Sequence, residues 1–200
     1  TLNLDVTGIR ANKRGRLTVN MHYQTEIPHI YAVGDVIGQP ALASTSAEQG
    51  RLAARHALGL NSPSIDDNLP IGIYTIPEIS MVGKTEEELT SAGVAYESGI
   101  ARYKEIARGV IIGDNFGVLK VLFNPESRRV LGVHIFGSQA SELLHIGQAV
   151  MQLGGTIDYF VETIFNYPTF AEAYKVAGLD GVNKIDRYTQ STPNARNASN

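Results

Sequence analysis

The chain has 200 residues, of which 43% are hydrophobic and 18% are charged, and its net charge is −3. These values are ordinary for a soluble globular protein, and the scattered lysines and arginines, with no apolar run near the length of about 20 residues that a membrane span needs, predict neither a nucleic-acid nor a membrane partner. Cysteine is absent, which excludes disulfides, thiolate nucleophiles and cysteine-ligated metal sites within these residues and favours a cytoplasmic location.

The first part of the chain has the pattern of an α/β unit. Arg16–Val19 alternates polar and apolar residues, which predicts a half-buried strand, and the apolar run Ile30–Val33 predicts a buried strand that ends in a turn. Apolar side chains at helical spacing among small residues then predict a helix over Ala41–Leu58. Gly59 follows as a typical helix stop.

A polar, proline-containing stretch, residues 61–68, interrupts this pattern and predicts a linker between two domains. Beyond it, Thr85 is followed three residues later by Glu88, a capping-box signature that predicts a short helix closed by Gly93. Asn124–Ser127 has the composition of a hairpin turn between two apolar runs. The strands expected in this part of the chain are Ile71–Thr75, Ile79–Val82, Tyr96–Ala101, Val118–Phe123 and Val130–Phe136.

Helical patterns dominate the end of the second part. They lie at Ala140–Leu153, Ile157–Thr163 and Phe170–Ala177. Residues 188–200 are rich in Asn, Ser and Thr, and we expect them to form a disordered tail. Strands followed by helices indicate an α+β fold with an antiparallel sheet, which we assign to residues 69–187.

One segment carries residues suited to ligand binding. Gly34 and Asp35 follow the predicted strand at Ile30–Val33, and ligands bind at the carboxyl ends of strands in α/β sheets. Glycine permits close approach of a ligand to the backbone, and a carboxylate accepts hydrogen bonds from a polyol. The N–H groups at the start of the next helix, at residues 41–43, attract an electron-rich group. From these residues alone, a turn with a solvated aspartate is at least as good an interpretation.

The same segment resembles a known motif. The spacing Thr-x5-Tyr-Ala-x-Gly-Asp over residues 25–35, followed by a helix of small residues, is similar to the second flavin-contacting motif of the FAD-dependent pyridine nucleotide-disulfide oxidoreductases. The resemblance implies that Asp35 binds the ribitol chain of FAD, with Gly34 beside it. It also implies that the backbone of Leu42 and Ala43 faces the pyrimidine edge of the flavin.

Three further motifs extend the resemblance almost to the end of the chain. Residues 74–86, 131–142 and 166–172 are similar, in this order, to motifs of the family's dimerisation domain. The resemblance implies that residues 1–60 are the C-terminal part of an FAD-binding domain and that residues 69–187 form a dimerisation domain. It also implies a homodimer in which each copy completes the active site of the other.

The last motif departs from the disulfide reductases at one position. Their pattern is His-Pro-Thr-x-x-Glu, in which the histidine is the acid/base for a redox-active dithiol, whereas this chain has Tyr167 in its place and keeps Glu172. An unperturbed tyrosine titrates near pKa ~10 and is a poor proton acceptor at neutral pH. The sequence is similar instead to the soluble transhydrogenase branch of the family.

That branch implies hydride transfer between NADPH and NAD through FAD, with no acid/base needed at position 167. Two interpretations of Tyr167 stay open, one in which it lines the flavin site and one in which it only packs at the subunit interface. Glu172 is interpreted as a helix-start or hydrogen-bonding residue. We therefore assign a catalytic role to neither Tyr167 nor Glu172.

Alternatives to this function also stay open. A lipoamide-dehydrogenase-like or mercuric-reductase-like flavoprotein with an altered last motif would need a redox cysteine pair upstream, and the isolated chain is alternatively a homodimerisation module without activity. The chain has no Gly-x-Gly-x-x-Gly motif and no initiator methionine, so we expect a C-terminal half that neither binds FAD tightly nor turns over alone. Glu142-x-x-His145 occurs once, and a di-iron site needs two copies, so no metal is expected.

Overall fold

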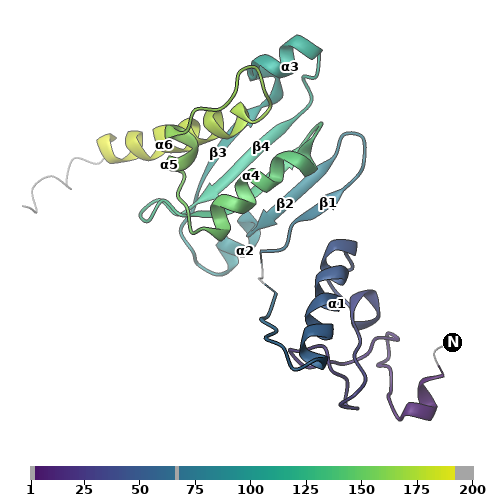
Figure 1. Ribbon diagram of the computed structural model, residues 1–200. Coiled ribbons are helices and arrows are strands. Elements are labelled where there is room, and N and C mark those ends of the chain that lie inside the picture. Colours follow the sequence, from purple (N-terminus) through teal and green to yellow (C-terminus); the bar gives the residue numbers. More distant parts are fainter. Residues whose placement is uncertain (1–2, 66–67, 192–200) are drawn as a thin grey trace, which may run out of the picture. The chain divides into compact units, whose positions relative to one another are not determined.

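The computed structural model describes residues 3–65 and 68–191 (Figure 1). The chain divides into two compact units, Thr1–Asp67 and Asn68–Asn200, and each unit is described by itself. No helix among the described residues is long and apolar enough to cross a membrane.

The first unit contains short turns of 3-10 helix and one long helix. Its elements are η1 (Leu4–Thr7), η2 (Gly34–Ile37) and α1 (Ala43–Ala57). The prediction of a helix at the end of this unit is confirmed. Its buried side chains follow helical spacing on one face of α1, because every third or fourth residue of a helix points the same way; they are Thr45, Gln49, Leu52 and Ala53.

The two strands predicted in the first unit are wrong. Leu17 donates its N–H to the carbonyl of Val36 at 2.8 Å, and Tyr31 forms a single antiparallel bridge with Gln24, but neither contact extends into a ladder among residues 3–65. A strand needs a neighbouring strand that pairs along its length, and the described part of this unit supplies none. The apolar residues of both segments are nevertheless buried or partly buried, and Leu17 and Ala32 pack in one small core with Ile9.

The second unit is built on a five-stranded antiparallel sheet in the order β1-β2-β5-β4-β3. Alternate residues are buried along β2 and β3, as a sheet covered on one face requires, and the central strands β4 and β5 carry additional buried residues. The turn between β4 and β5 is held by Asn124, whose Oδ1 accepts from the N–H groups of Glu126 and Ser127. The predicted antiparallel sheet and hairpin are therefore confirmed. The strands are β1 (Ile71–Ile73), β2 (Ile79–Gly83), β3 (Glu97–Arg102), β4 (Val118–Phe123) and β5 (Val130–Phe136).

Helices pack against one face of this sheet (Figure 1). Here α4 (Ala140–Gln152) packs on β5 and β2, while α6 (Glu172–Ser191) packs on β3 and β4, and α5 (Asp158–Glu162) packs against α6. The core between them is apolar and holds the largest fully buried side chains of the unit, among them Tyr103, Phe123, Phe160 and Tyr174.

Helix α6 is longer than predicted. It continues to Ser191, four residues into the stretch 188–200 that was expected to be disordered, because extending an existing helix by one residue costs far less than starting a new one. The rest of that stretch, residues 192–200, lies outside the described residues.

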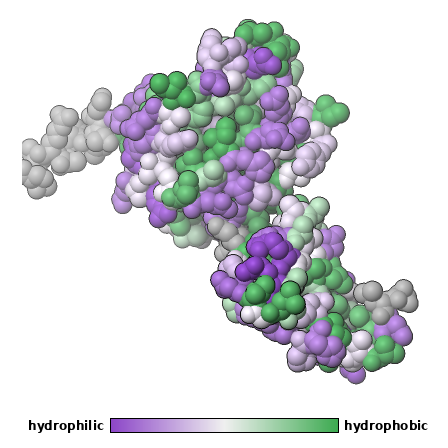
Figure 2. Space-filling view, in the orientation of Figure 1, coloured by the Kyte–Doolittle hydropathy of each residue, from purple (hydrophilic) through white to green (hydrophobic). Residues whose placement is uncertain are grey.

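Two short helices complete the second unit. The predicted capping box at α2 (Glu86–Ser91) is confirmed, since Thr85 Oγ1 accepts from the N–H of Glu88 and the Glu88 carboxylate accepts from the N–H of Thr85. Helix α3 (Ala107–Ile112), which follows η3 (Tyr103–Glu105), was not predicted. Its consecutive β-branched residues lack helical spacing. They are exposed at the tip of the unit, where Figure 2 shows apolar side chains.

Side chains of α6 hydrogen-bond to the backbone of the edge strand β3. Asp180 accepts from the N–H of Ile100 at 2.9 Å, and Lys184 Nζ donates to the carbonyl of Ser98 at 2.7 Å. These side chains occupy backbone groups that would otherwise be free to pair with a strand of another chain. The contact requires Gly99 between them, because a Cβ there would lie 2.0 Å from the Ala177 carbonyl oxygen.

The burial of His134 predicts that the free energy of unfolding depends on pH. His134 lies on β5, where its Nε2 is 3.0 Å from the Lys84 carbonyl oxygen. Burial lowers the pKa of its imidazole below the usual 6.5, and Lys120 acts in the same direction, whereas the hydrogen bond to Lys84 and the charges of Glu86 and Glu88 oppose this shift. The unfolded chain therefore binds the proton more readily. The contribution of neutral His134 to the free energy of unfolding is fully present above pH 6.5. It is lost as the pH falls through the pKa of His134 in the folded chain.

We expect the unfolding midpoint in urea to fall between about pH 7.5 and about pH 5, and we expect His134→Gln to reduce this fall. Circular dichroism of the chain at both pH values measures it. His29→Gln, at an exposed position, is the matched control. An identical pH dependence in wild type and His134→Gln would contradict the assignment.

Candidate functional site

Gly34 is held tightly between the first unit's loop and α1. Its N–H donates to Gln49 Oε1 at 2.7 Å, and its φ of +74° is a conformation that glycine adopts without strain. A Cβ at this position would lie 3.0 Å from Ser46 Oγ, in the first turn of α1. The backbone at Gly34 therefore lies directly against the start of the helix.

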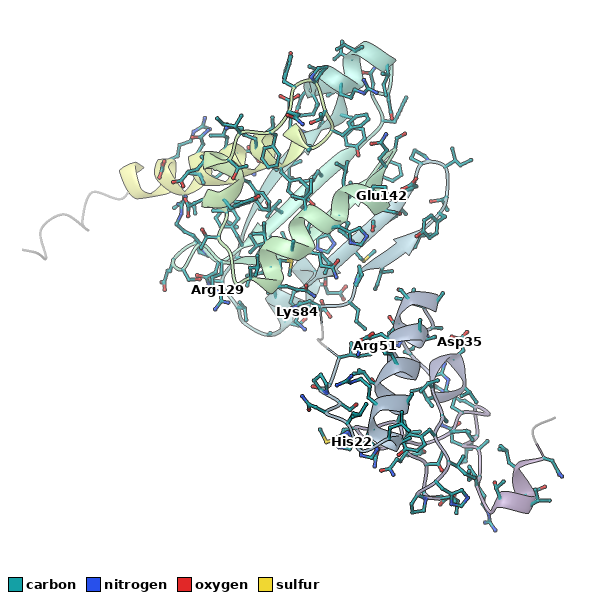
Figure 3. All side chains as sticks on the ribbon, viewed as in Figure 1. His22, Asp35, Arg51, Lys84, Arg129 and Glu142 are labelled. Atoms are coloured by element: carbon teal, nitrogen blue, oxygen red, sulfur yellow. The ribbon has the colours of Figure 1, made fainter. Side chains whose placement is uncertain are left out.

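Asp35 is exposed in the first turn of η2, next to α1 (Figure 3). The prediction placed it at the end of a strand, which is incorrect in detail, although Val33 before it is extended, with φ −141° and ψ 163°. Its carbonyl oxygen accepts from the N–H of Gly38 at 3.1 Å. No described residue hydrogen-bonds to its carboxylate, so this group is available to a ligand.

The N-terminus of α1 is open. Leu42 is the extended residue before the helix and supplies no side-chain cap. The first intrahelical bond runs from the N–H of Ser46 to the Leu42 carbonyl, so the N–H groups of residues 43–45 have no acceptor among the described residues. Free N–H groups and the helix dipole make such an end attractive to an electron-rich group. Gly34, Asp35, Leu42 and Ala43 thus all lie around the start of one helix.

Tyr167 and Glu172 lie in the second unit. The Tyr167 side chain is 74% exposed, in a loop closed by Thr169, whose Oγ1 donates to the Asn166 carbonyl at 2.7 Å. Glu172 is the first residue of α6, and its carboxylate lies 3.5 Å from the N–H of Thr169. Both residues line a hollow of about 420 Å³ beside α3, together with Glu105, Ile106, Ala107, Val110, Ile111 and Val176.

Two buried polar residues of the first unit were assigned no role from the sequence, although Thr25 begins the motif that carries the resemblance. Gln49 is buried and fixes the Gly34 backbone; its signal was a polar residue on the apolar face of a predicted helix. Thr25 is buried too, and its hydroxyl lies 3.0 Å from the Ile30 carbonyl oxygen, which it can donate to. Within α1, hydrogen bonding to Arg51 lowers the pKa of the Glu48 carboxyl. Among the described residues, no cluster of side chains could hold a metal ion.

Comparison with known proteins identifies both units. A family described as "Pyridine nucleotide-disulphide oxidoreductase, dimerisation domain" matches residues 69–177, and one described as "Pyridine nucleotide-disulphide oxidoreductase" matches residues 1–50. Among curated proteins, the soluble pyridine nucleotide transhydrogenase of Mycobacterium bovis is 56% identical over 94% of this chain and 40% of its own length. That of Klebsiella pneumoniae is 53% identical over 92% of this chain and 41% of its own length.

Solved structures agree with this result. The HOCl-induced flavoprotein disulfide reductase RclA from Escherichia coli has a TM-score of 0.83 at 28% identity, covering 89% of this chain and 42% of that one. LpdA from Mycobacterium tuberculosis has a TM-score of 0.80 at 28% identity, covering 89% of this chain and 39% of that one. The chain thus spans about two fifths of the length of these proteins. The fold class expected from the sequence is confirmed.

Proposed function

Because this chain belongs to the pyridine nucleotide-disulphide oxidoreductase family, we propose that it is the C-terminal part of an FAD-dependent transhydrogenase, which transfers hydride between NADPH and NAD. The observation that carries the proposal is the loop at the start of α1, with its free Asp35 carboxylate and open helix N-terminus. The identity of 53–56% to proteins named soluble pyridine nucleotide transhydrogenase supports the choice of branch.

In this proposal, Asp35 accepts hydrogen bonds from the ribitol hydroxyls of FAD. The backbone of Leu42 and Ala43 faces the electron-rich pyrimidine edge of the flavin, where the helix dipole favours negative charge. Gly34 lets the backbone approach the cofactor, since it has no side chain and its conformation is fixed by Gln49. When bound, FAD would supply the hydride chemistry, accepting from one nicotinamide and donating to the other.

The second unit serves dimerisation in this proposal. Tyr167 is too exposed for a core residue, and Ile164, three residues before it in the sequence, is 92% exposed. Such exposed apolar side chains suit a surface that a second copy covers. We propose that Tyr167 of one copy lines the flavin site of the other, where no proton acceptor is required, and that Glu172 only orders the start of α6. The absence of cysteine supports a cytoplasmic location.

A disulfide reductase is the second candidate, favoured by the likeness to RclA, a flavoprotein disulfide reductase. Tyrosine at position 167 argues against it, because thiol–disulfide exchange needs a proton acceptor for the thiol. Disulfide reduction by the full-length protein in place of hydride exchange would establish this alternative.

The full-length protein tests the proposal. We expect it to be yellow with bound FAD and to transfer hydride from NADPH to an NAD analogue that has a distinct absorbance. The 200-residue chain should be colourless and inactive but dimeric in size-exclusion chromatography with light scattering. A colourless full-length protein, supplied with FAD, would contradict the proposal, and a monomeric chain would contradict the role of the second unit.

A further inference from the structure

Tyr103 occupies a rigid slot in the second unit. Its ring is fully buried, and its hydroxyl donates to the Ser138 carbonyl at 2.9 Å. Two glycines form the slot, since a Cβ at Gly117 would lie 2.3 Å from the ring and one at Gly137 would lie 2.7 Å from it. The ring therefore has one position in the folded unit.

Phe170 stacks on this fixed ring. The two ring centroids are 4.4 Å apart with an interplanar angle of 27°, and Phe170 is only 3% exposed. Phe170 is also the first buried residue after the exposed Tyr167, and the Thr169–Asn166 hydrogen bond closes the short loop between them. The loop that presents Tyr167 is consequently anchored at one end to Tyr103.

We infer that Phe170 and Tyr103 are positioning residues, which fix where Tyr167 stands relative to the flavin of a second copy. The inference rests on the proposed function, since it takes Tyr167 to line that site. It accounts for the combination of a largely exposed tyrosine with a rigid support. A tyrosine that only filled space at the interface would not need this support. Here two glycines fix the ring of Tyr103, and that ring fixes Phe170, which lies three residues after Tyr167 in the sequence.

A second stack in the same core provides the control. Phe160 is fully buried and stacks on Tyr174, with centroids 4.7 Å apart and an interplanar angle of 29°. It lies on α5, and its partner bonds to α4 through Leu143 and Gly147. Phe160→Leu therefore removes a stack of the same kind from the same unit without touching the loop at Tyr167.

The experiment compares Phe170→Leu with Phe160→Leu in the full-length protein. We expect both variants to lower Tm and to keep FAD and the dimer, but only Phe170→Leu to lower kcat for hydride exchange, by about tenfold with KM unchanged. In a Tyr167→Ala background, Phe170→Leu should lower kcat no further, because both changes remove the same placement. If the leucine variant loses FAD, Phe170→Met, a softer replacement of similar size, takes its place.

The possible failures are distinguishable. A wild-type protein without FAD or hydride exchange defeats the proposed function. An active wild type in which Tyr167→Ala has no effect shows that Tyr167 does not serve the site. If Tyr167→Ala lowers kcat, then equal kcat in the two leucine variants, or effects of Phe170→Leu and Tyr167→Ala that multiply, would overturn the inference and leave the proposed function standing.

Discussion

Replacing Gly99 with alanine is expected to destabilise the second unit by about 3 kcal/mol, at the upper end of the usual cost of overpacking. The new Cβ would lie 2.0 Å from the Ala177 carbonyl oxygen and 2.9 Å from its carbon, and both atoms belong to the backbone of α6. A flexible side chain could move aside, but a helix backbone cannot move without leaving the strand. The hydrogen bonds of Asp180 and Lys184 to β3 would break with it.

Urea unfolding of the 200-residue chain, followed by circular dichroism, measures this loss. Gly50→Ala is the matched control, because Gly50 lies inside α1 and a Cβ there meets nothing within 4 Å. That variant should be neutral or more stable by about 0.5–1 kcal/mol, as alanine is the better helix former. A Gly99→Ala protein as stable as wild type would mean that α6 does not pack on β3 as closely as described.

The second unit could be predicted from sequence because its signals are local. The apolar runs at β4 and β5, a turn at Asn124 and a capping box at Thr85 are each visible within a few residues, and each appears in the structure. Helix α3 could not be predicted, since its apolar residues are consecutive and exposed. What holds this part of the chain in place is Tyr103, which no local pattern indicates.

The first unit shows the opposite case. The apolar residues of segments 16–19 and 30–33 are buried in part, as predicted, but these segments lack strand partners within the described residues. Strand formation depends on a neighbour that may lie anywhere in a sequence, whereas burial depends on the residue itself. The loop after residue 33 could be proposed as a site only through its resemblance to a family, because glycine and aspartate in a turn have many uses. The structure adds the reason for glycine at position 34, because its φ is +74° and its N–H is held by Gln49.

In the full-length protein, Asp35→Ala is expected to weaken FAD binding by at least about tenfold and to reduce hydride exchange in proportion to the FAD lost. A hydrogen bond to a charged group contributes about 1.5–3 kcal/mol, and about 1.4 kcal/mol corresponds to a factor of ten. No described residue bonds to this carboxylate, so its removal should not disturb the fold. Titration of the apoprotein with FAD, followed by flavin fluorescence, gives the affinity, and added FAD should restore the exchange rate.

Asp5→Ala is the control for this prediction, because Asp5 repeats the local geometry of Asp35 without the site. Each aspartate lies exposed in the first turn of a 3-10 helix, and each carbonyl accepts from a glycine three residues later, Gly8 at 3.3 Å and Gly38 at 3.1 Å. The Asp35 turn lies against the first turn of α1, since a Cβ at Gly34 would lie 3.0 Å from Ser46 Oγ, whereas a Cβ at Gly8, at the end of the Asp5 turn, would meet nothing within 4 Å. Equal FAD affinities for the two variants would show that a carboxylate in such a turn is solvated rather than bound to the cofactor, which is the interpretation that the residues alone also allow.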